Sequence, residues 1–258
     1  MTKFLRRAKM SDAVWDLALL AIVLAIGDAI AGVSAGIGYR LELWDYRDGI
    51  GALRYVAWLA IAICITGAVA LAGGLGYRRP GAIACGAFSI LIAGVTAFIP
   101  WSLREQLNRV PPIHDISTDT VNPPQYVHAA KTRRKGEHPV EYDGPEVAAQ
   151  QKKAFPDIQP IVLEAPAFKV FRSAENVLVG MGLEVVEVDP AQGRIEATDR
   201  SLLFGFGDNV VLRVAQRADG KTVVDVRSKS RVGRSDLGVN ATRIRVFSKT
   251  LGKVLGAA

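Results

Sequence analysis

The polar residues between Arg227 and Arg243 are those whose types and spacing could support chemistry. Arginines recur in this stretch, and a guanidinium can hold a phosphate or a carboxylate through paired hydrogen bonds. The loop from Gly233 to Gly238 leads into an expected helix, whose first N–H groups can bind an anion. The stretch therefore predicts an anion-binding site. Its candidate residues are Asp208, Arg227, Ser228, Ser230, Arg231, Arg234, Ser235, Asp236, Asn240 and Arg243.

The same stretch also fits a structural role. Alternate residues of a strand point to opposite faces, so Ser228 and Ser230 fall on the packed face, and Arg227 and Arg231 on the open face. The serines then need hydrogen-bond partners, for which Asn240 and the backbone at the start of the last helix are candidates.

Two acidic residues complete this structural alternative. Asp236 would fix the strand-to-helix turn by capping and Asx-type bonds. Arg227 would pair across the sheet with Asp208 or Asp225. The arginines of the open face would then be a solvated surface, and both readings of the stretch stay open.

Catalysis has less support than binding. No histidine follows His138, both cysteines (Cys64 and Cys85) lie in apolar stretches, and neither a G-x-S-x-G elbow, a P-loop nor a dinucleotide fingerprint occurs. No catalytic residue and no cofactor are therefore predicted. An enzyme acting on a cell-envelope substrate is the alternative, with Asp208, Ser235 and Asp236 as acidic or nucleophilic members.

The three histidines, His114, His128 and His138, lie in a proline-rich segment. His114 with Asp115 and Asp119 could be considered a metal site, but no cysteine or second histidine shares a helix face with it, which suits zinc poorly. The sequence favours a solvated loop, and no metal site is predicted.

The elements that would position these residues follow from periodicity. Apolar residues at helical spacing predict a helix over 166–180, and a second apolar stripe predicts one from about 237, with Ser235 or Asp236 as N-cap. Strands are expected at 183–188, 194–198, 208–216 and 221–231, joined by glycine turns. Residues 161–258 are thus expected to form a two-layer α+β domain, with an antiparallel four-stranded sheet and two helices on one face.

Upstream, residues 105–160 form a connecting segment of a different character. Prolines recur through it with little apolar periodicity. Because proline fixes φ and removes a hydrogen-bond donor, the segment is expected to be extended or loop-like.

Residues 1–104 are expected to be a transmembrane region. Apolar runs at about 13–38, 53–76 and 82–101 each reach the roughly 20 residues that a helix needs to cross a bilayer. Aromatic residues lie near their ends, as at membrane interfaces. The sequence thus predicts three transmembrane helices and a lipid bilayer as a partner.

Basic residues predict the orientation. Four of them precede the first span, and Arg78 and Arg79 lie in the second connection. The positive-inside rule then places the N-terminus in the cytoplasm and, after three crossings, the C-terminal domain in the periplasm of a bacterial inner membrane.

Asp28 lies within the first span, where carboxyls are costly and often mark ion paths. A component of a membrane transport complex is therefore a further alternative. The structural reading is that Asp28 is protonated, or packs against Thr66 or another helix.

Charge excludes one class of partner. Lysine and arginine number 9 before residue 102 and 23 after it, and aspartate and glutamate 6 and 19, so the two parts carry 9 − 6 = +3 and 23 − 19 = +4. Neither is basic enough to indicate nucleic acid. The expected partner of the outer domain is an anionic ligand or another membrane protein.

Three motifs resemble the DUF1499 family, a group of bacterial and plastid-related proteins of unassigned function. Residues 113–126 are similar to the lead-in INDISTDxxxPPxF, with His114 where the family more often has Asn. Residues 201–209 resemble S-r-l-f-r-F-x-D-D, with Asn209 in place of the second Asp. Residues 227–243 closely resemble RSxSRxGxSDxGxNxxR. The resemblance covers about 108–258 and implies a fold but no activity.

Overall fold

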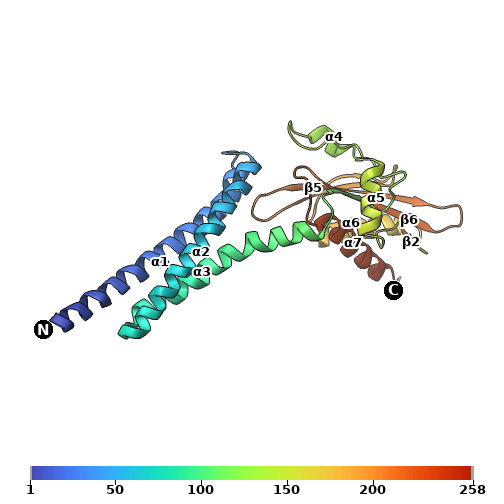
Figure 1. Ribbon diagram of the computed structural model, residues 1–258. Coiled ribbons are helices and arrows are strands. Elements are labelled where there is room, and N and C mark those ends of the chain that lie inside the picture. The colour runs from blue at the N-terminus through green and yellow to red at the C-terminus, as the bar shows by residue number, and fades with distance from the viewer. Residues whose placement is uncertain (1, 257–258) are drawn as a thin grey trace. The chain divides into compact units, whose positions relative to one another are not determined.

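The computed structural model describes residues 2–256, whose elements are labelled in Figure 1. The described chain divides into two compact units. One runs to Glu105 and includes Leu202–Gly205, and the other contains the remaining residues.

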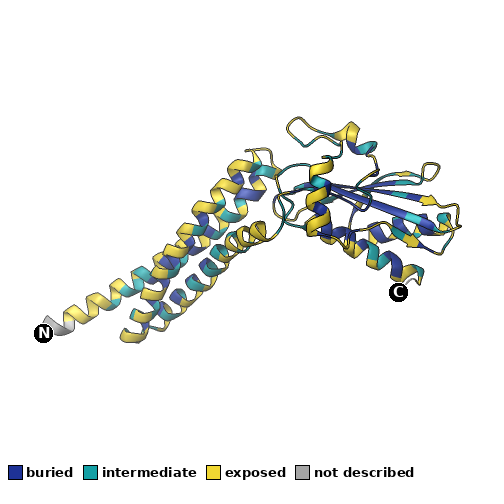
Figure 2. Ribbon diagram, turned by 45° about the vertical axis from the view of Figure 1, so that its right-hand side comes forward, coloured by how far each residue is buried: buried dark blue, intermediate teal, exposed yellow. Residues whose placement is uncertain are grey.

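The helical unit is built from α1 (Thr2–Arg40), α2 (Tyr46–Tyr77) and α3 (Pro80–Arg109), the last of which runs on past Glu105. All three helices are long and apolar enough to cross a membrane, and the predicted runs lie within them. They are exposed over much of their length (Figure 2). Exposed apolar side chains are what a helix presents to lipid.

Small residues set the packing within this unit. Alanines of all three helices are completely buried, among them Ala18, Ala60 and Ala93. A Cβ on Gly86 of α3 would lie only 2.8 Å from the backbone nitrogen of Leu71 in α2. Close backbone approach of this kind is how membrane helices gain packing contacts.

The second unit is an α+β domain with one antiparallel sheet in the order β1-β6-β5-β4-β3, and β2 also pairs with β6. The sheet has six strands, so the expectation of four was wrong. The strands are β1 (Asp115–Ser117), β2 (Ile161–Leu163), β3 (Glu184–Asp189), β4 (Arg194–Arg200), β5 (Gly207–Gln216) and β6 (Thr222–Ser230). The register of β3 against β4 shifts between Val185 and Glu187.

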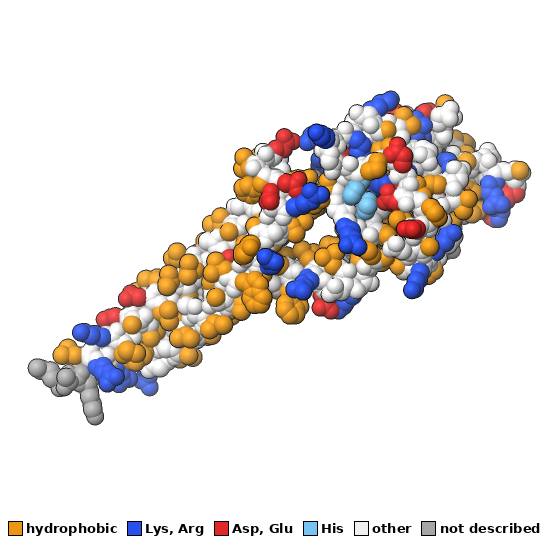
Figure 3. All heavy atoms as spheres, turned by 45° about the horizontal axis from the view of Figure 1, so that its top comes forward, with side chains coloured by type: hydrophobic (Ala, Val, Ile, Leu, Met, Phe, Trp, Pro, Cys, Tyr) orange, Lys and Arg blue, Asp and Glu red, His pale blue; other side chains and the backbone are white. Residues whose placement is uncertain are grey.

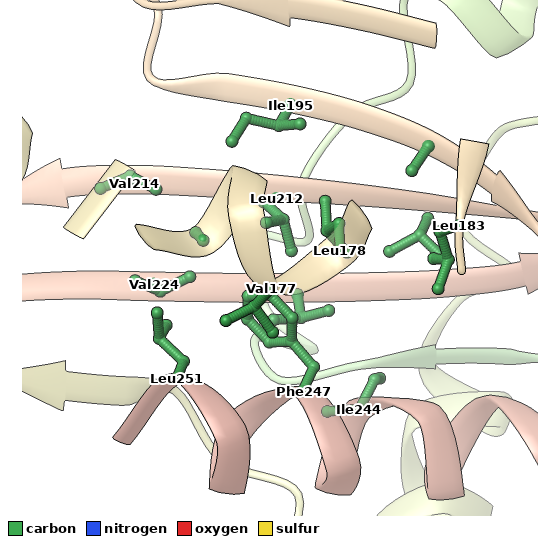
Figure 4. Packing of buried hydrophobic residues seen from close by; sticks show 14 of the residues in the cluster. Val177, Leu178, Leu183, Ile195, Leu212, Val214, Val224, Ile244, Phe247 and Leu251 are labelled. Carbon is green, nitrogen blue, oxygen red and sulfur yellow. The ribbon is translucent and has the colours of Figure 1, made fainter. Parts of the chain in front are cut away.

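Helices α6 (Ala167–Gly180) and α7 (Val239–Leu255) lie on one face of the sheet, here called the inner face. The core fills the space between them: Val177 and Leu178 of α6 and Phe247 of α7 point toward strand residues such as Leu212 (Figure 4). Helical periodicity had predicted this arrangement because both stripes are long.

The segment between α3 and β2 is folded with the sheet. It supplies β1 and the helices α4 (His128–Thr132) and α5 (Pro145–Ala154). Residues 118–143, here called the strap, lie against the outer face, where Tyr126 and Val140 pack on Val211 of β5. The expectation of an extended, loop-like segment missed these short elements.

Candidate functional site

The predicted site residues of β6 divide between the two faces of the sheet. Ser228 and Ser230 face α7, whereas Arg227, Lys229 and Arg231 face the strap. The alternation was predicted, but the sequence did not show that the strap covers the outer face.

On the inner face, Asn240 of α7 binds both serines. The Oδ1 atom of Asn240 accepts a hydrogen bond from Ser228 Oγ at 2.6 Å, and its Nδ2 donates to Ser230 Oγ at 3.0 Å and to the carbonyl of His114 at 3.1 Å. The expected partnership between these serines and Asn240 is confirmed.

Arg243 extends this network to two carboxylates. One nitrogen, Nη1, donates to Ser228 Oγ at 2.8 Å and also to Asn240, while Nη2 binds Asp199 at 2.6 Å and Asp208 at 2.8 Å. Burial alone would lower the pKa of Arg243, but Asp208 and Asp199 raise it. Asp208 therefore pairs with Arg243, and not with Arg227 as the sequence suggested.

In the loop before α7, the carboxylate of Asp236 binds the backbone N–H groups at the start of the helix. Asp236 accepts hydrogen bonds from the backbone N–H of Gly238 at 2.9 Å and of Asn240 at 2.8 Å, and Ser235 Oγ accepts one from Leu237 N–H at 3.2 Å. Burial raises the pKa of Asp236. N–H groups expected to bind a ligand are thus used by Asp236, as the structural alternative proposed.

On the outer face, Arg227 is completely buried, so the expectation that it lies on an open face was wrong. It holds Asp115 of β1 with two hydrogen bonds of 2.9 and 2.8 Å and also donates to the carbonyls of Pro124 and Val140. The rings of Tyr126 and Tyr142 lie 4.8 and 5.3 Å from its guanidinium carbon. Arg227 is a structural clamp that joins β6, β1 and the strap.

Two further charged residues fix the strap. Lys229 Nζ binds Asp143 at 2.6 Å and the carbonyl of Glu141 at 2.6 Å, and is itself fully buried. The buried carboxylate of Glu196 on β4 accepts hydrogen bonds from three backbone N–H groups, those of residues 127, 128 and 129. Neither residue is among the site residues predicted from the sequence.

The polar atoms without partners in the sheet domain lie in and beside the strap. The guanidinium of Arg133 is buried, yet none of its three nitrogens has a hydrogen-bond partner among residues 2–256. The carboxylate of Glu137 lies 3.9 Å from the guanidinium of Arg133 and 3.7 Å from that of Arg231. Burial and the charge of Arg231 lower the pKa of Arg133. This Arg133–Arg231 pair is the candidate site.

Arg231 is positioned by the sheet. Its Nε donates to Asn209 Oδ1 at 3.1 Å, and its backbone carbonyl accepts a hydrogen bond from His138 N–H at 2.7 Å. Arg234, by contrast, is exposed in the loop after β6. Of the ten predicted residues, the structure thus places only Arg231 at the unsatisfied guanidinium.

Two histidines, His138 of the strap and His114 just before β1, lie beside the end of β6. The rings of His114 and His138 stack with centroids 3.9 Å apart, and His138 Nε2 lies 2.9 Å from the carbonyl of Gly233. Burial and then the neighbouring His138 lower the pKa of His114. His114 is mostly buried, so the expected solvated loop was wrong at this residue.

The two carboxylates considered with His114 as metal ligands pair with arginines instead. Asp115 pairs with Arg227 and Asp119 with Arg213, whose Nη2 is 3.0 Å away. Among residues 2–256, no group of three or more His, Cys, Asp and Glu is placed to hold a metal ion. Figure 3 shows one face on which acidic, basic and histidine side chains gather over the sheet domain.

In the helical unit, Asp28 is 3% exposed, and neither carboxylate oxygen has a hydrogen-bond partner among the described residues. The Thr66 hydroxyl, which the sequence offered as a partner, donates instead to the carbonyl of Ala62. Asp28 is therefore buried within the helical unit without Thr66.

The sequence carries no signal that points to Arg133. This residue lies in the basic run Lys131-Thr-Arg-Arg-Lys135, and such a run is typical of a solvated loop. Its burial depends on Tyr126 and Glu196, which hold α4 against the sheet.

The comparisons with known proteins agree with the motifs. No curated protein matches the chain. The model of the DUF1499 family, described as a protein of unknown function, matches residues 115–251, which is more than half of the chain. Its limits run from β1 into α7 and so include the strap, β6 and the inner-face network. The chain belongs to the DUF1499 family.

Proposed function

We propose that this protein is a membrane-anchored binding module whose sheet domain holds an anionic ligand between Arg133 and Arg231. The observation that carries the proposal is the buried Arg133 guanidinium, which has no hydrogen-bond partner among residues 2–256. A buried donor without a partner costs about 1–3 kcal/mol, and more when it is charged. A ligand that supplies acceptors at this position recovers that free energy.

The chemistry of the pair favours a phosphate or carboxylate group. A guanidinium presents several donors in a planar fork that matches these anions. Two guanidiniums with one carboxylate between them leave a net positive charge at the site. Binding of an anion by this pair requires neither a nucleophile nor a metal.

Glu137 acts as an internal competitor in this proposal. Its carboxylate lies 3.9 Å from Arg133 and 3.7 Å from Arg231, longer than hydrogen bonds to either guanidinium. It therefore neutralises part of the charge but leaves the donors of Arg133 for a ligand.

The three apolar helices would hold the domain at a membrane. The basic N-terminal tail and the Arg78–Arg79 turn support a cytoplasmic N-terminus. With three crossings, the sheet domain is then periplasmic in a bacterial inner membrane. Its ligand would be a lipid head group, a cell-envelope polymer or an acidic surface of another membrane protein.

Thermal unfolding of the full-length chain in a nonionic detergent, with inorganic phosphate as the probe, tests the proposal. A ligand that binds only the folded state stabilises it by about 2.7 kcal/mol at a hundredfold excess over Kd. We expect phosphate to raise the Tm of the wild type more than chloride at equal ionic strength. Arg133→Gln should abolish this difference, and Glu137→Gln should enlarge it.

Lys135→Gln is the matched control, because it removes one positive charge from an exposed residue of the same loop. It should keep the phosphate response. Equal responses in the wild type and Arg133→Gln would overturn the proposal, as would no response in both the wild type and Glu137→Gln. If Arg133→Gln does not fold, Arg133→Lys retains the charge without the planar fork and should weaken the response.

A further inference from the structure

Helices α6 and α7 together carry a groove. Its volume is about 570 Å³, and Val177 and Met181 of α6 and Val246, Thr250 and Val254 of α7 line it. Val246, Thr250 and Val254 are spaced four residues apart, so they form one stripe along α7. The groove is therefore a continuous feature of the helical layer.

Exposed apolar side chains adjoin this groove. Val254, which is 58% exposed, and Val246, which is 46% exposed, line the groove itself. Phe168 and Val179 of α6, 74% and 59% exposed, lie outside the groove on the solvent side of the same helix. The core of the domain does not use these side chains, because it is formed by the opposite faces of the two helices. Apolar surface gathered on one face typically marks an interaction site.

Basic residues flank the apolar ones. Lys169 and Arg172 are exposed on α6, and Lys249 and Lys253 on α7. Their nearest acidic neighbour along α6, Glu175, is half-buried. The face thus combines apolar side chains with an excess of positive charge. Arg245 adds none, because Asp157 holds it with hydrogen bonds of 2.6 and 2.7 Å.

We propose that the α6–α7 face binds the surface of an anionic lipid bilayer. Helices that lie in a membrane interface combine apolar residues, which enter the acyl boundary, with lysine and arginine, which contact anionic head groups. The same chain carries three helices able to cross a membrane, which would tether the domain to a bilayer. Binding here is independent of the Arg133–Arg231 pair, which lies on the other side of the sheet.

A second copy of the chain is a poorer occupant. In a two-fold symmetric dimer each patch meets itself. Lys249 and Lys253 of one copy would then oppose the basic residues of the other, and like charges at an interface are unfavourable. An anionic lipid surface neutralises the same charges.

The test places a reporter in the groove of the full-length chain. Cys64→Ala, Cys85→Ala and Thr250→Cys leave one thiol, which is labelled with an environment-sensitive fluorophore. The protein is reconstituted in nanodiscs of phosphatidylcholine, with or without phosphatidylglycerol. We expect a blue-shifted emission, and quenching by spin-labelled lipid, only when phosphatidylglycerol is present.

Charge variants identify the contact. Each lysine near an anionic surface contributes about a fivefold factor, so Lys249→Gln with Lys253→Gln should lower the docked-to-undocked ratio by roughly 25-fold. Lys152→Gln with Lys153→Gln removes the same charge from exposed positions on α5 and should leave the ratio unchanged.

Three outcomes would overturn the inference. One is an emission that is identical in both kinds of nanodisc. The second is an equal effect of the two lysine pairs. The third is a blue shift in detergent alone that grows with protein concentration, which would show a second copy as the occupant. Hydrogen exchange of residues 239–255 in the unlabelled wild type repeats the comparison without the fluorophore.

Discussion

The two faces of the sheet use charged and polar residues of the same strand in different ways. On the inner face, Ser228, Ser230, Asn240 and Arg243 form a network with hydrogen bonds at each side chain. On the outer face, Arg227 and Lys229 are equally well paired, but buried polar atoms without hydrogen-bond partners lie in and beside the strap. Among the described residues of the sheet domain, these atoms belong to Arg133 and Tyr142 of the strap and to His114 beside it.

This difference separates structural residues from candidate functional ones. A satisfied network fixes a fold and leaves no donor for a ligand. A buried polar atom that lacks a partner costs free energy, and such costs collect at functional sites. The arginines that looked most like ligand residues in the sequence, Arg227 and Arg243, are therefore structural, whereas Arg133 is the functional candidate.

The largest expected effect is that of Arg227→Ala. It leaves Asp115 buried without its bidentate partner, and removing one member of a buried ion pair costs about 3–5 kcal/mol. Chemical denaturation of the full-length chain in detergent measures the loss. Arg217→Ala, an exposed arginine of the β5–β6 turn, is the control and should change stability by less than about 1 kcal/mol.

Arg243→Ala tests the inner face. It unpairs Asp208, which is largely buried, and Asp199, which is partly exposed. We expect a loss of about 2–3 kcal/mol, because solvent compensates in part. The phosphate-induced rise in Tm should persist in this variant. A lost phosphate response in a variant that still folds would show that the inner face is part of the site.

Arg133→Met should behave in the opposite way. Replacing a buried, unpaired guanidinium by an apolar side chain of similar length is expected to be neutral or stabilising by about 1 kcal/mol. The phosphate response should disappear. A destabilisation of about 3 kcal/mol in the same denaturation experiment would show that Arg133 is structural after all, and would remove the contrast between the two faces.

The smallest effect concerns pH. The pKa of His114 is lowered in the fold, so the unfolded chain binds more protons below the ordinary histidine pKa of about 6.5. The stability contributed by neutral His114 is present above that pH and is lost as the pH falls through it. His114→Asn should flatten the slope of unfolding free energy between about pH 5 and 7. His128→Asn is the control, and an unchanged slope in His114→Asn would refute the assignment.

The long elements were predictable, whereas the short ones were not. β5 and β6 span 10 and 9 residues and are joined by a glycine-containing turn, and the apolar stripes of α6 and α7 run over several turns. β1 and β2 have three residues each, which is too few for a period to be seen. Their place in the sheet depends on pairing with β6.

The buried ion pairs of the outer face escaped the sequence for a related reason. Alternating Arg227 and Lys229 read as a solvated face because their partner Asp115 lies 112 residues upstream of Arg227. Only the pairing of β1 with β6 brings them together. The Asn240–Ser228 bond spans 12 residues and was predicted, because the strand and helix that carry it are adjacent in the chain.

The shape of the sheet edges has a consequence for solubility. β1 and β2 pair with β6 at one edge of the sheet, and β3 is the edge strand on the opposite side. It is short, its register is interrupted between Val185 and Glu187, and it carries Glu184 and Asp189. Irregular, charged edge strands resist pairing with the edges of other sheets. The β3 edge is therefore a poor template for intermolecular strand addition.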